Sequence, residues 1–118
     1  MQTFDRDLSI VVPVYNEEES LVALHTEITQ AMANTGIDYE VIYVDDGSKD
    51  RSAQIVEELH QQDARVVLVS FRRNFGQTAG FAAGFNTASG GVVITLDADG
   101  QNDPADIPSM MAKLDETG

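Results

Sequence analysis

Two carboxylates, Asp97 and Asp99, carry the clearest chemical signal in this sequence. They follow the apolar run 92–96 and precede the turn residues 100–104. A buried strand has no structural need for acids at its end, although Asp also occurs as a plain turn former. Mg²⁺ and Mn²⁺ prefer hard oxygen ligands, and one or two carboxylates commonly hold such an ion while substrate phosphates complete its shell. With Gln101 as a further oxygen ligand, the sequence predicts a metal–diphosphate site here.

Two other clusters of polar residues follow apolar runs in the same way. Asp45 and Asp46 come after the run 39–44, and 15–17 (Tyr-Asn-Glu) comes after 8–14. Adjacent acids repel each other, so at least one of the pair is expected to have a ligand partner, and a carboxylate can accept the N–H of a nucleotide base. Tyr15 packs either against a base or against the core; its position in the sequence leaves both interpretations open.

The elements that must position these clusters alternate along the chain. Strands are predicted at 8–14, 39–44, 66–71 and 91–96. Helices are predicted from an N-cap at Asn16, with 17–19 in the first turn, to Gly36; from a cap at Ser48 or Asp50 to about 62; from 76 to about 88; and from Pro104 onward. This order predicts an α/β fold, a mostly parallel sheet of about four strands with helices on both faces. Ligands of such sheets bind outside the carboxyl ends of the strands, where all three clusters would meet.

Composition narrows the class of protein. The chain has 118 residues and a hydrophobic fraction of 42%, which fits one globular domain over 1–118. Its net charge of −13 argues against a nucleic-acid partner, because phosphate backbones are neutralised by Lys and Arg. There is no Cys, so no disulfide or Cys-based metal site. No apolar stretch approaches the roughly 20 residues of a membrane-spanning helix, and the polar first residues are unlike a signal peptide.

Several further residues have plainer interpretations. Gly76, Gly80 and Gly84 recur every four residues, which indicates close packing of a helix on the sheet. Arg72 and Arg73 either reach a diphosphate or are solvated surface charges, the commoner case. His25 and His60 lie on predicted helices and are expected to be exposed.

Taken together, four segments resemble the family 2 glycosyltransferases with the GT-A fold. Within that family they are most similar to the branch of dolichyl-phosphate mannosyltransferase and the undecaprenyl-phosphate sugar transferases. The resemblance implies that the predicted sheet is the Rossmann-like, nucleotide-binding half of a GT-A domain. The segments are IVVPVYNE (10–17), VDDGSKD (44–50), RRNFG (72–76) and LDADGQ (96–101).

The resemblance assigns the nucleotide pocket residue by residue. Pro13, Tyr15 and Glu17 match positions that line the pocket, and Asp46 matches the acid that meets the base. Asp97 matches the acid near the ribose and diphosphate.

The resemblance also assigns the catalytic metal site. Asp99 matches the principal ligand of Mg²⁺ or Mn²⁺, with Asp97 and Gln101 completing the metal-binding set. The sequence departs from the family pattern at Gln77, where many relatives carry Lys, and at 100–103, where the polyprenyl-phosphate branch often has Leu and His-Pro.

The implied activity is inverting transfer of a sugar from a UDP- or GDP-linked donor to a polyprenyl phosphate or a cell-envelope glycan. Family catalytic domains are considerably longer than 118 residues. The chain is therefore expected to be the donor-binding half, truncated before the acceptor-binding half and inactive alone. The full protein is expected at the cytoplasmic face of the membrane, with membrane association through parts absent from this chain.

Two other classes fit parts of the pattern. A receiver-type signalling domain shares the size, acidity and strand–helix alternation, but its acidic pair follows the first strand, and here Asp45 and Asp46 follow the second. A non-catalytic nucleotide-binding module fits the short chain. Phosphorylation by a small phosphodonor would indicate the first, and nucleotide binding without transfer by the full protein would indicate the second.

Overall fold

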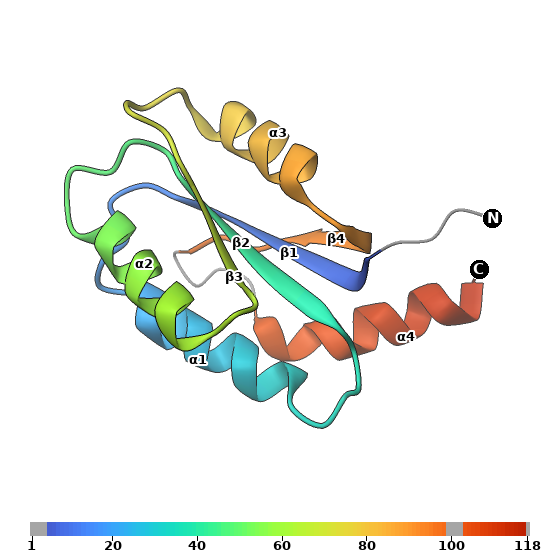
Figure 1. Cartoon of the computed structure of the whole chain (residues 1–118). Helices are drawn as coiled ribbons and strands as arrows, with labels where there is room; N and C mark the ends of the chain where they lie inside the picture. The colour runs from blue at the N-terminus through green and yellow to red at the C-terminus, as the bar shows by residue number, and fades with distance from the viewer. Residues whose placement is uncertain (1–4, 99–102, 118) are drawn as a thin grey trace.

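The computed structural model describes residues 5–98 and 103–117, in which strands and helices alternate (Figure 1). The predicted α/β class is confirmed, with strand and helix positions within a few residues of those expected from periodicity. The elements are β1 (Arg6–Val14), α1 (Leu21–Met32), β2 (Tyr39–Asp45), α2 (Ser52–Gln62), β3 (Val66–Ser70), α3 (Gln77–Thr87), β4 (Gly90–Thr95), the 3₁₀ helix η1 (Pro104–Asp106) and α4 (Ile107–Thr117).

The sheet is parallel throughout and has the strand order β3-β2-β1-β4. Figure 1 shows α1, α2 and α4 on one face and α3 on the other. Strands β2 and β3 are added in turn on one side of β1, and β4 then pairs with the other side of β1. The chain therefore changes direction at β1, and the carboxyl ends of β1 and β4 lie next to each other at this switch point.

The core has one part on each face, because successive side chains of a strand point to opposite sides of the sheet. Tyr43 and Ile10 belong to the larger cluster under α1, α2 and α4. Val11, Ile42 and Val44 form the smaller cluster under α3. Every residue of β2 is buried, as expected for a central parallel strand covered on both faces.

Helix α3 packs closely on the sheet through two glycines, as the sequence predicted. A Cβ on Gly84 would lie 2.4 Å from Cγ1 of Val11, so only glycine fits at this spacing. A Cβ on Gly80 would meet Pro13 at 3.8 Å, an ordinary contact. The third glycine differs from the prediction: Gly76 contacts nothing through the missing Cβ and instead has a φ of +99°, which ordinary side chains disfavour.

The first helix begins later than predicted. Asn16 is not its N-cap, and residues 17–19 precede its first turn, because α1 starts at Leu21. Asn16 has a φ of +53° and serves a turn instead: its Oδ1 accepts the N–H of Lys49 at 2.8 Å, and its own N–H donates to Ser48 Oγ at 2.9 Å. The side chain of Asn16 thus joins the loop after β1 to the loop after β2.

His25 is buried, 7% exposed, which corrects the prediction of an exposed side chain. Its Nδ1 lies 2.8 Å from the hydroxyl of Tyr43, and its Nε2 lies 3.1 Å from Oδ2 of Asp63. Burial raises the pKa of Tyr43, so its hydroxyl keeps the proton. The ionised carboxylate of Asp63 can only accept, so Nε2 of His25 carries a proton and donates it to Asp63. His60 is exposed, as predicted.

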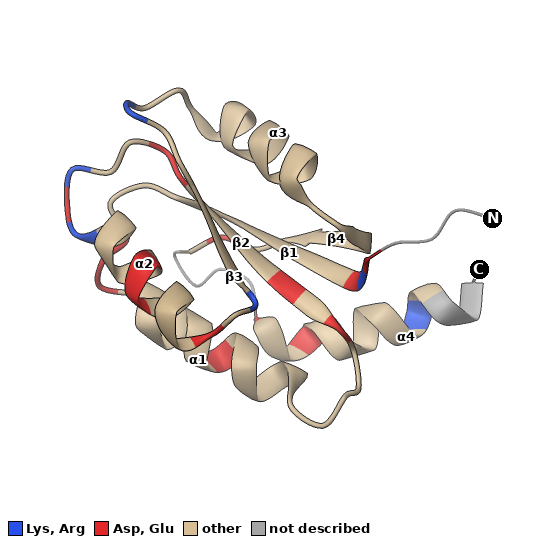
Figure 2. Cartoon of the chain, viewed as in Figure 1, with Lys and Arg blue, Asp and Glu red and all other residues tan. Residues whose placement is uncertain are grey.

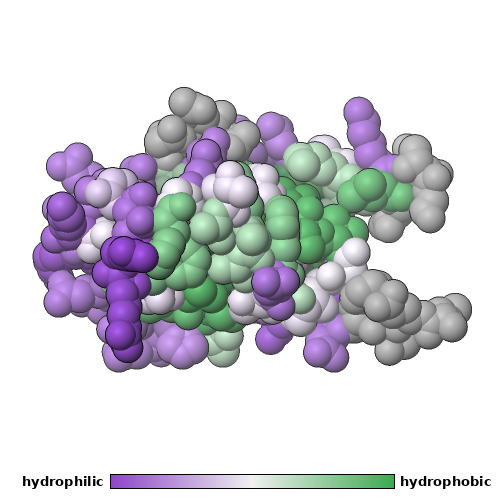
Figure 3. Space-filling model, turned by 90° about the horizontal axis from the view of Figure 1, so that it is seen from above, coloured by the Kyte–Doolittle hydropathy of each residue, from purple (hydrophilic) through white to green (hydrophobic). Residues whose placement is uncertain are grey.

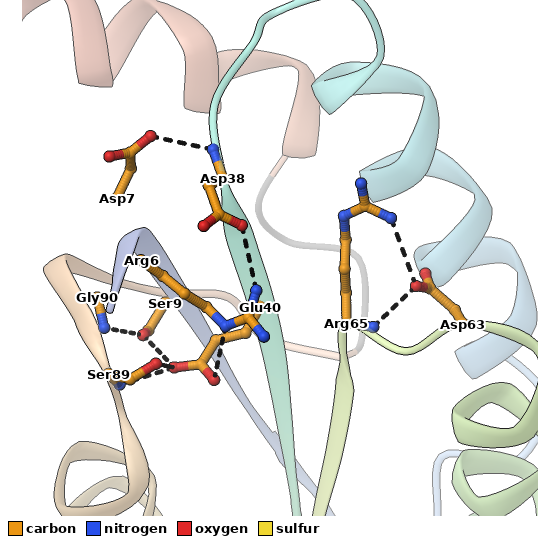
Figure 4. Close-up of polar contacts among 9 residues, drawn as sticks. All are labelled: Arg6, Asp7, Ser9, Asp38, Glu40, Asp63, Arg65, Ser89 and Gly90. Atoms are coloured by element: carbon orange, nitrogen blue, oxygen red, sulfur yellow. Dashed lines mark hydrogen bonds and ion pairs between the residues drawn. The ribbon is translucent and has the colours of Figure 1, made fainter. Parts of the chain in front are cut away.

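A buried carboxylate holds the turn between α3 and β4 (Figure 4). Glu40, 5% exposed, accepts hydrogen bonds from Ser9 Oγ at 2.6 Å, Ser89 N at 2.7 Å and Ser89 Oγ at 2.8 Å. Ser9 Oγ in turn accepts the N–H of Gly90 at 2.8 Å. Burial by itself would raise the pKa of Glu40, but these bonds and the nearby Arg6 hold it below its ordinary value. The network fixes where β4 begins.

Among the helices that the structure describes, none is long and apolar enough to cross a bilayer.

Candidate functional site

A pocket of about 250 Å³ lies at the carboxyl end of the sheet, beside the switch point at β1. It opens between the ends of β1 and β2, the start of α3 and the residues after β4. This is where parallel α/β sheets bind their ligands. Its lining residues are Pro13, Val14, Tyr15, Glu17, Asp46, Asn74, Gly76, Gln77, Gly80, Asp97 and Ala98.

The structure brings five of the predicted site residues together in this pocket. Pro13, Tyr15 and Glu17 come from the end of β1 and the turn after it, Asp46 follows β2, and Asp97 follows β4. They meet because β1 lies between β2 and β4 in the sheet. Their placement agrees with the sequence analysis, and their individual roles stay predictions.

Asp46 is buried and both of its carboxylate oxygens accept backbone N–H groups. Oδ1 accepts from Phe75 at 2.7 Å and Oδ2 from Gly76 at 3.0 Å. Gly47 brings the same segments together, since a Cβ on it would lie 2.3 Å from the carbonyl carbon of Arg73. The loop after β2 therefore holds the loop that begins α3, and Asp46 forms the join between two walls of the pocket.

Asp45 and Asp46 point to opposite sides of the sheet end. Asp45 follows the alternation of β2 onto the side of Tyr43, away from the pocket, and is 2% exposed. Its Oδ1 has no hydrogen-bond partner among the described residues. Asp46 thus has backbone N–H partners within the chain, and a ligand partner for the acidic pair stays a prediction.

The turn after β1 presents Tyr15 and Glu17 to the pocket. Tyr15 is 42% exposed, which decides between the two interpretations of its ring: it is available to a ligand and does not pack in the core. The N–H of Glu17 donates to Ser52 Oγ at 2.9 Å, and Ser52 is fully buried at the start of α2. Helix α2 therefore anchors the turn that carries both side chains.

The predicted metal ligands are described only in part. Asp97 is half-buried and lines the pocket. Asp99 and Gln101 lie outside the described residues. Within the described ranges, no cluster of three or more His, Cys, Asp or Glu side chains is arranged to hold a metal.

Sequence reasoning missed part of the pocket wall. Val14, Asn74 and Ala98 line it without having been singled out, and Gly80 had been assigned only to packing. Gln77, where the sequence departs from the family pattern, also lies in the wall. The signal for these residues was their position: each is at a strand end, or at the start of the helix that covers the smaller part of the core.

Comparison with known proteins agrees with this geometry. S. aureus TarS residues 1–349 in complex with UDP-GlcNAc matches with a TM-score of 0.80 and 25% identity, over 93% of this chain and 31% of that one. A crystal structure of S. aureus TarS 1–349 matches with a TM-score of 0.73 and 26% identity, over 93% of this chain and 32% of that one. The mannosyltransferase PcManGT from Pyrobaculum calidifontis, in complex with GDP-Man and Mn²⁺, matches at 0.70 and 22% identity, over 83% and 31%, which shows a shared fold.

This chain spans about a third of the length of these structures. Its four-stranded sheet corresponds to the Rossmann-like half of their GT-A fold. The sequence profile of glycosyl transferase family 2 matches residues 9–118, nearly the whole chain. The chain belongs to glycosyl transferase family 2.

Proposed function

We propose that residues 1–118 form the donor-binding part of a glycosyltransferase and hold a nucleotide-diphosphate sugar in the pocket at the sheet switch point. One observation carries the proposal: Pro13, Tyr15, Glu17, Asp46 and Asp97, predicted from separate segments, line one pocket. The family match supports it, as does the UDP-GlcNAc in TarS, which has the same fold.

The nucleotide end of the donor would bind between Tyr15 and Asp46. The exposed ring of Tyr15 offers a stacking surface, and a base N–H can bond to the lone pairs that Asp46 does not use for the loop. Because the loop fixes the carboxylate through two bonds, its position does not have to be established by the ligand. UDP is the first nucleotide to test, and GDP is the second.

The diphosphate end would lie toward Asp97, with Mg²⁺ or Mn²⁺ held by Asp97, Asp99 and Gln101. All three supply hard oxygen ligands, so the donor set suits such an ion. When bound, the metal supplies Lewis-acid stabilisation of the nucleoside diphosphate that leaves. Asp97 lies in the pocket wall next to Ala98, on the side opposite Asp46 along the sheet. The two acids would therefore hold the two ends of the donor.

The reaction in the full protein would be inverting hexosyl transfer, with a polyprenyl phosphate or a cell-envelope glycan as acceptor, at the cytoplasmic face of the membrane. Similarity of the four sequence segments to the polyprenyl-phosphate branch supports this finer assignment. A phosphate acceptor is already anionic and needs little help from a base.

A second candidate is a module that binds nucleotides without transfer. The observation in its favour is that this chain spans about a third of the structures it matches. If the full-length protein transfers a labelled sugar and residues 1–118 do not, the chain is the donor-binding part of an enzyme. If both bind nucleotide and neither transfers sugar, the chain is a non-catalytic binding module.

Titration calorimetry with UDP tests the donor site, in Mn²⁺ and then in EDTA. The chain has no Trp, so intrinsic Trp fluorescence is not a usable readout. Asp97→Asn and Asp99→Asn are expected to lower the affinity in Mn²⁺ by about 10- to 100-fold, the range for one charged partner, and to change it little in EDTA. Asp106→Asn, an exposed acid of η1, is the matched control. Unchanged metal dependence in the first two variants would overturn the metal assignment.

A further inference from the structure

Two adjoining loops carry most of the positive charge of this acidic chain. Four of its seven Lys and Arg residues follow β2 or β3, against 20 acids in the sequence. We name Lys49, Arg51, Arg72 and Arg73 the cationic tip; all four are exposed. Figure 2 shows the blue segments of these two loops beyond the carboxyl ends of β2 and β3, at one end of the molecule.

Most side chains of the cationic tip form no ion pair with a described carboxylate. At the other end of the sheet, Arg6 pairs with Asp38 at 3.1 Å and Arg65 with Asp63 at 3.8 Å. Within the described ranges, Lys49, Arg72 and Arg73 pair with no carboxylate, and Arg51 only approaches Glu58 at 3.9 Å, with both side chains well exposed. These exposed cations are therefore available to an anionic partner.

The loop from Arg72 to Gly76 is held rigidly and presents an apolar ring beside the cations. Asp46 and Gly47 fix its backbone, as described above. Phe75 is 55% exposed, and the guanidinium of Arg73 lies 4.9 Å from its ring centroid. An aromatic ring flanked by cations suits the boundary between headgroups and acyl chains of a bilayer.

The position of the cations favours a surface over a small anion in the pocket. Asn74, Gly76 and Gln77 of this segment line the pocket, but no residue of the cationic tip does. All four cations are exposed to solvent. Figure 3 shows hydrophilic residues gathered at this end of the molecule and apolar ones over the rest of the α3 face.

We propose that the cationic tip docks on an anionic phospholipid surface, with Phe75 at headgroup level and the pocket mouth beside the membrane. The inference rests on the proposed function, because it places the sugar donor next to a lipid-phosphate acceptor.

The acidity of the chain restricts this docking to one orientation. The molecule is 42 Å long, whereas charges in physiological salt are screened over about 8 Å. Acids at the far end are therefore not felt by the surface. Acids also lie at this end: Glu17, Glu18, Glu19 and Asp50 line a hollow of their own between the turn after β1 and the loop after β2. Of these, Glu18 and Asp50 accept the backbone N–H groups of Arg51 and Glu18, each at 3.2 Å.

Co-sedimentation with vesicles tests the proposal. The chain is expected to bind vesicles of equal parts phosphatidylcholine and phosphatidylglycerol, to release them in high salt, and not to bind phosphatidylcholine alone. A cation near an anionic surface contributes about fivefold in partitioning, so Arg72→Gln/Arg73→Gln should lower it by about 25-fold. The matched control, Arg65→Gln/Lys113→Gln, removes the same charge elsewhere and should leave it nearly unchanged. Phe75→Ser should lower partitioning without altering the salt dependence.

Three results would overturn the proposal: equal binding to both vesicles, an equal loss in the control, or release of the chain from vesicles by inorganic phosphate or UDP at unchanged ionic strength. The last result would assign the cations to a soluble phosphate. Calorimetry with UDP on the same variants keeps the two proposals separate. If the chain binds vesicles but no nucleotide, membrane docking by the cationic tip is supported and the proposed donor site is refuted.

Discussion

The carboxylate of Asp46 accepts two backbone hydrogen bonds, from the N–H of Phe75 at 2.7 Å and from the N–H of Gly76 at 3.0 Å. A residue at the end of β2 thereby fixes where α3 begins, 30 positions later in the sequence. The pocket depends on this relationship, because Asp46 and Gly76 both line it. Asp46 is a positioning residue for the loop as well as a candidate contact for the base.

Replacing Asp46 should therefore affect stability and binding together. Asp46→Asn presents an amide N–H₂ to one of two backbone donors, so the free energy of unfolding in urea should fall by about 1–3 kcal/mol. The affinity for UDP should fall as well, because the pocket wall loosens. Asp106→Asn is the control for the loss of charge. If UDP binding weakens while stability is unchanged, Asp46 is only a ligand contact and does not hold the loop before α3 in place.

Two glycines of the same helix should respond oppositely to one added methyl group. Gly84→Ala places Cβ 2.4 Å from Cγ1 of Val11, and such overpacking typically costs about 1–3 kcal/mol of stability. Gly80→Ala meets only ordinary contacts and gains helix propensity of up to about 1 kcal/mol. Thermal unfolding of both variants measures the difference. Equal changes at the two positions would contradict the close packing of α3 on β1.

The Glu40 network should make stability fall in acid. The pKa of Glu40 is lowered in the folded chain from its ordinary 4.5, so its contribution is present above that value and is lost as the pH falls through the folded pKa. Burial by itself would raise the pKa of Asp63, but hydrogen bonds from Arg65 and His25 hold it below its ordinary value, so Asp63 adds the same trend.

The matching variant is Glu40→Gln, measured by urea unfolding between neutral pH and pH near 3. It should be about 1–3 kcal/mol less stable at neutral pH, because the amide cannot replace the carboxylate toward three donors. Its deficit should shrink in acid. A deficit that is constant across this range would show that the charge of Glu40 contributes nothing.

The buried hydroxyl of Tyr43 should stabilise the chain through His25. Tyr43→Phe leaves Nδ1 of His25 buried without its 2.8 Å partner, which should lower the free energy of unfolding by about 1–3 kcal/mol. Tyr15→Phe removes an equivalent hydroxyl from an exposed ring and should change stability little. If the two variants are equally stable, the hydrogen bond between the Tyr43 hydroxyl and His25 does not stabilise the chain.

The sequence by itself determined the parallel α/β fold and the set of residues at its carboxyl edge. Runs such as 8–14 and 39–44 alternate with periodic segments, and this local pattern decides element type. Parallel pairing then places the residues after each strand at one edge, so Pro13, Asp46 and Asp97 could be grouped before any coordinates. Asp99 and Gln101 belong to the same prediction and lie outside the described residues.

Only the tertiary structure decided which partners these residues have. Asn16 offers a good N-cap locally, yet it bonds across to Lys49 because the loop after β2 lies beside it. His25 sits on an amphipathic helix, yet Tyr43 and Asp63 bury it from two other elements. Asp45 and Asp46 are the same residue type, yet their side chains point to opposite faces of the sheet because successive residues alternate along β2. Local propensity acts over a few residues, whereas these contacts join segments 18 to 38 positions apart, so they follow from packing and not from the local pattern.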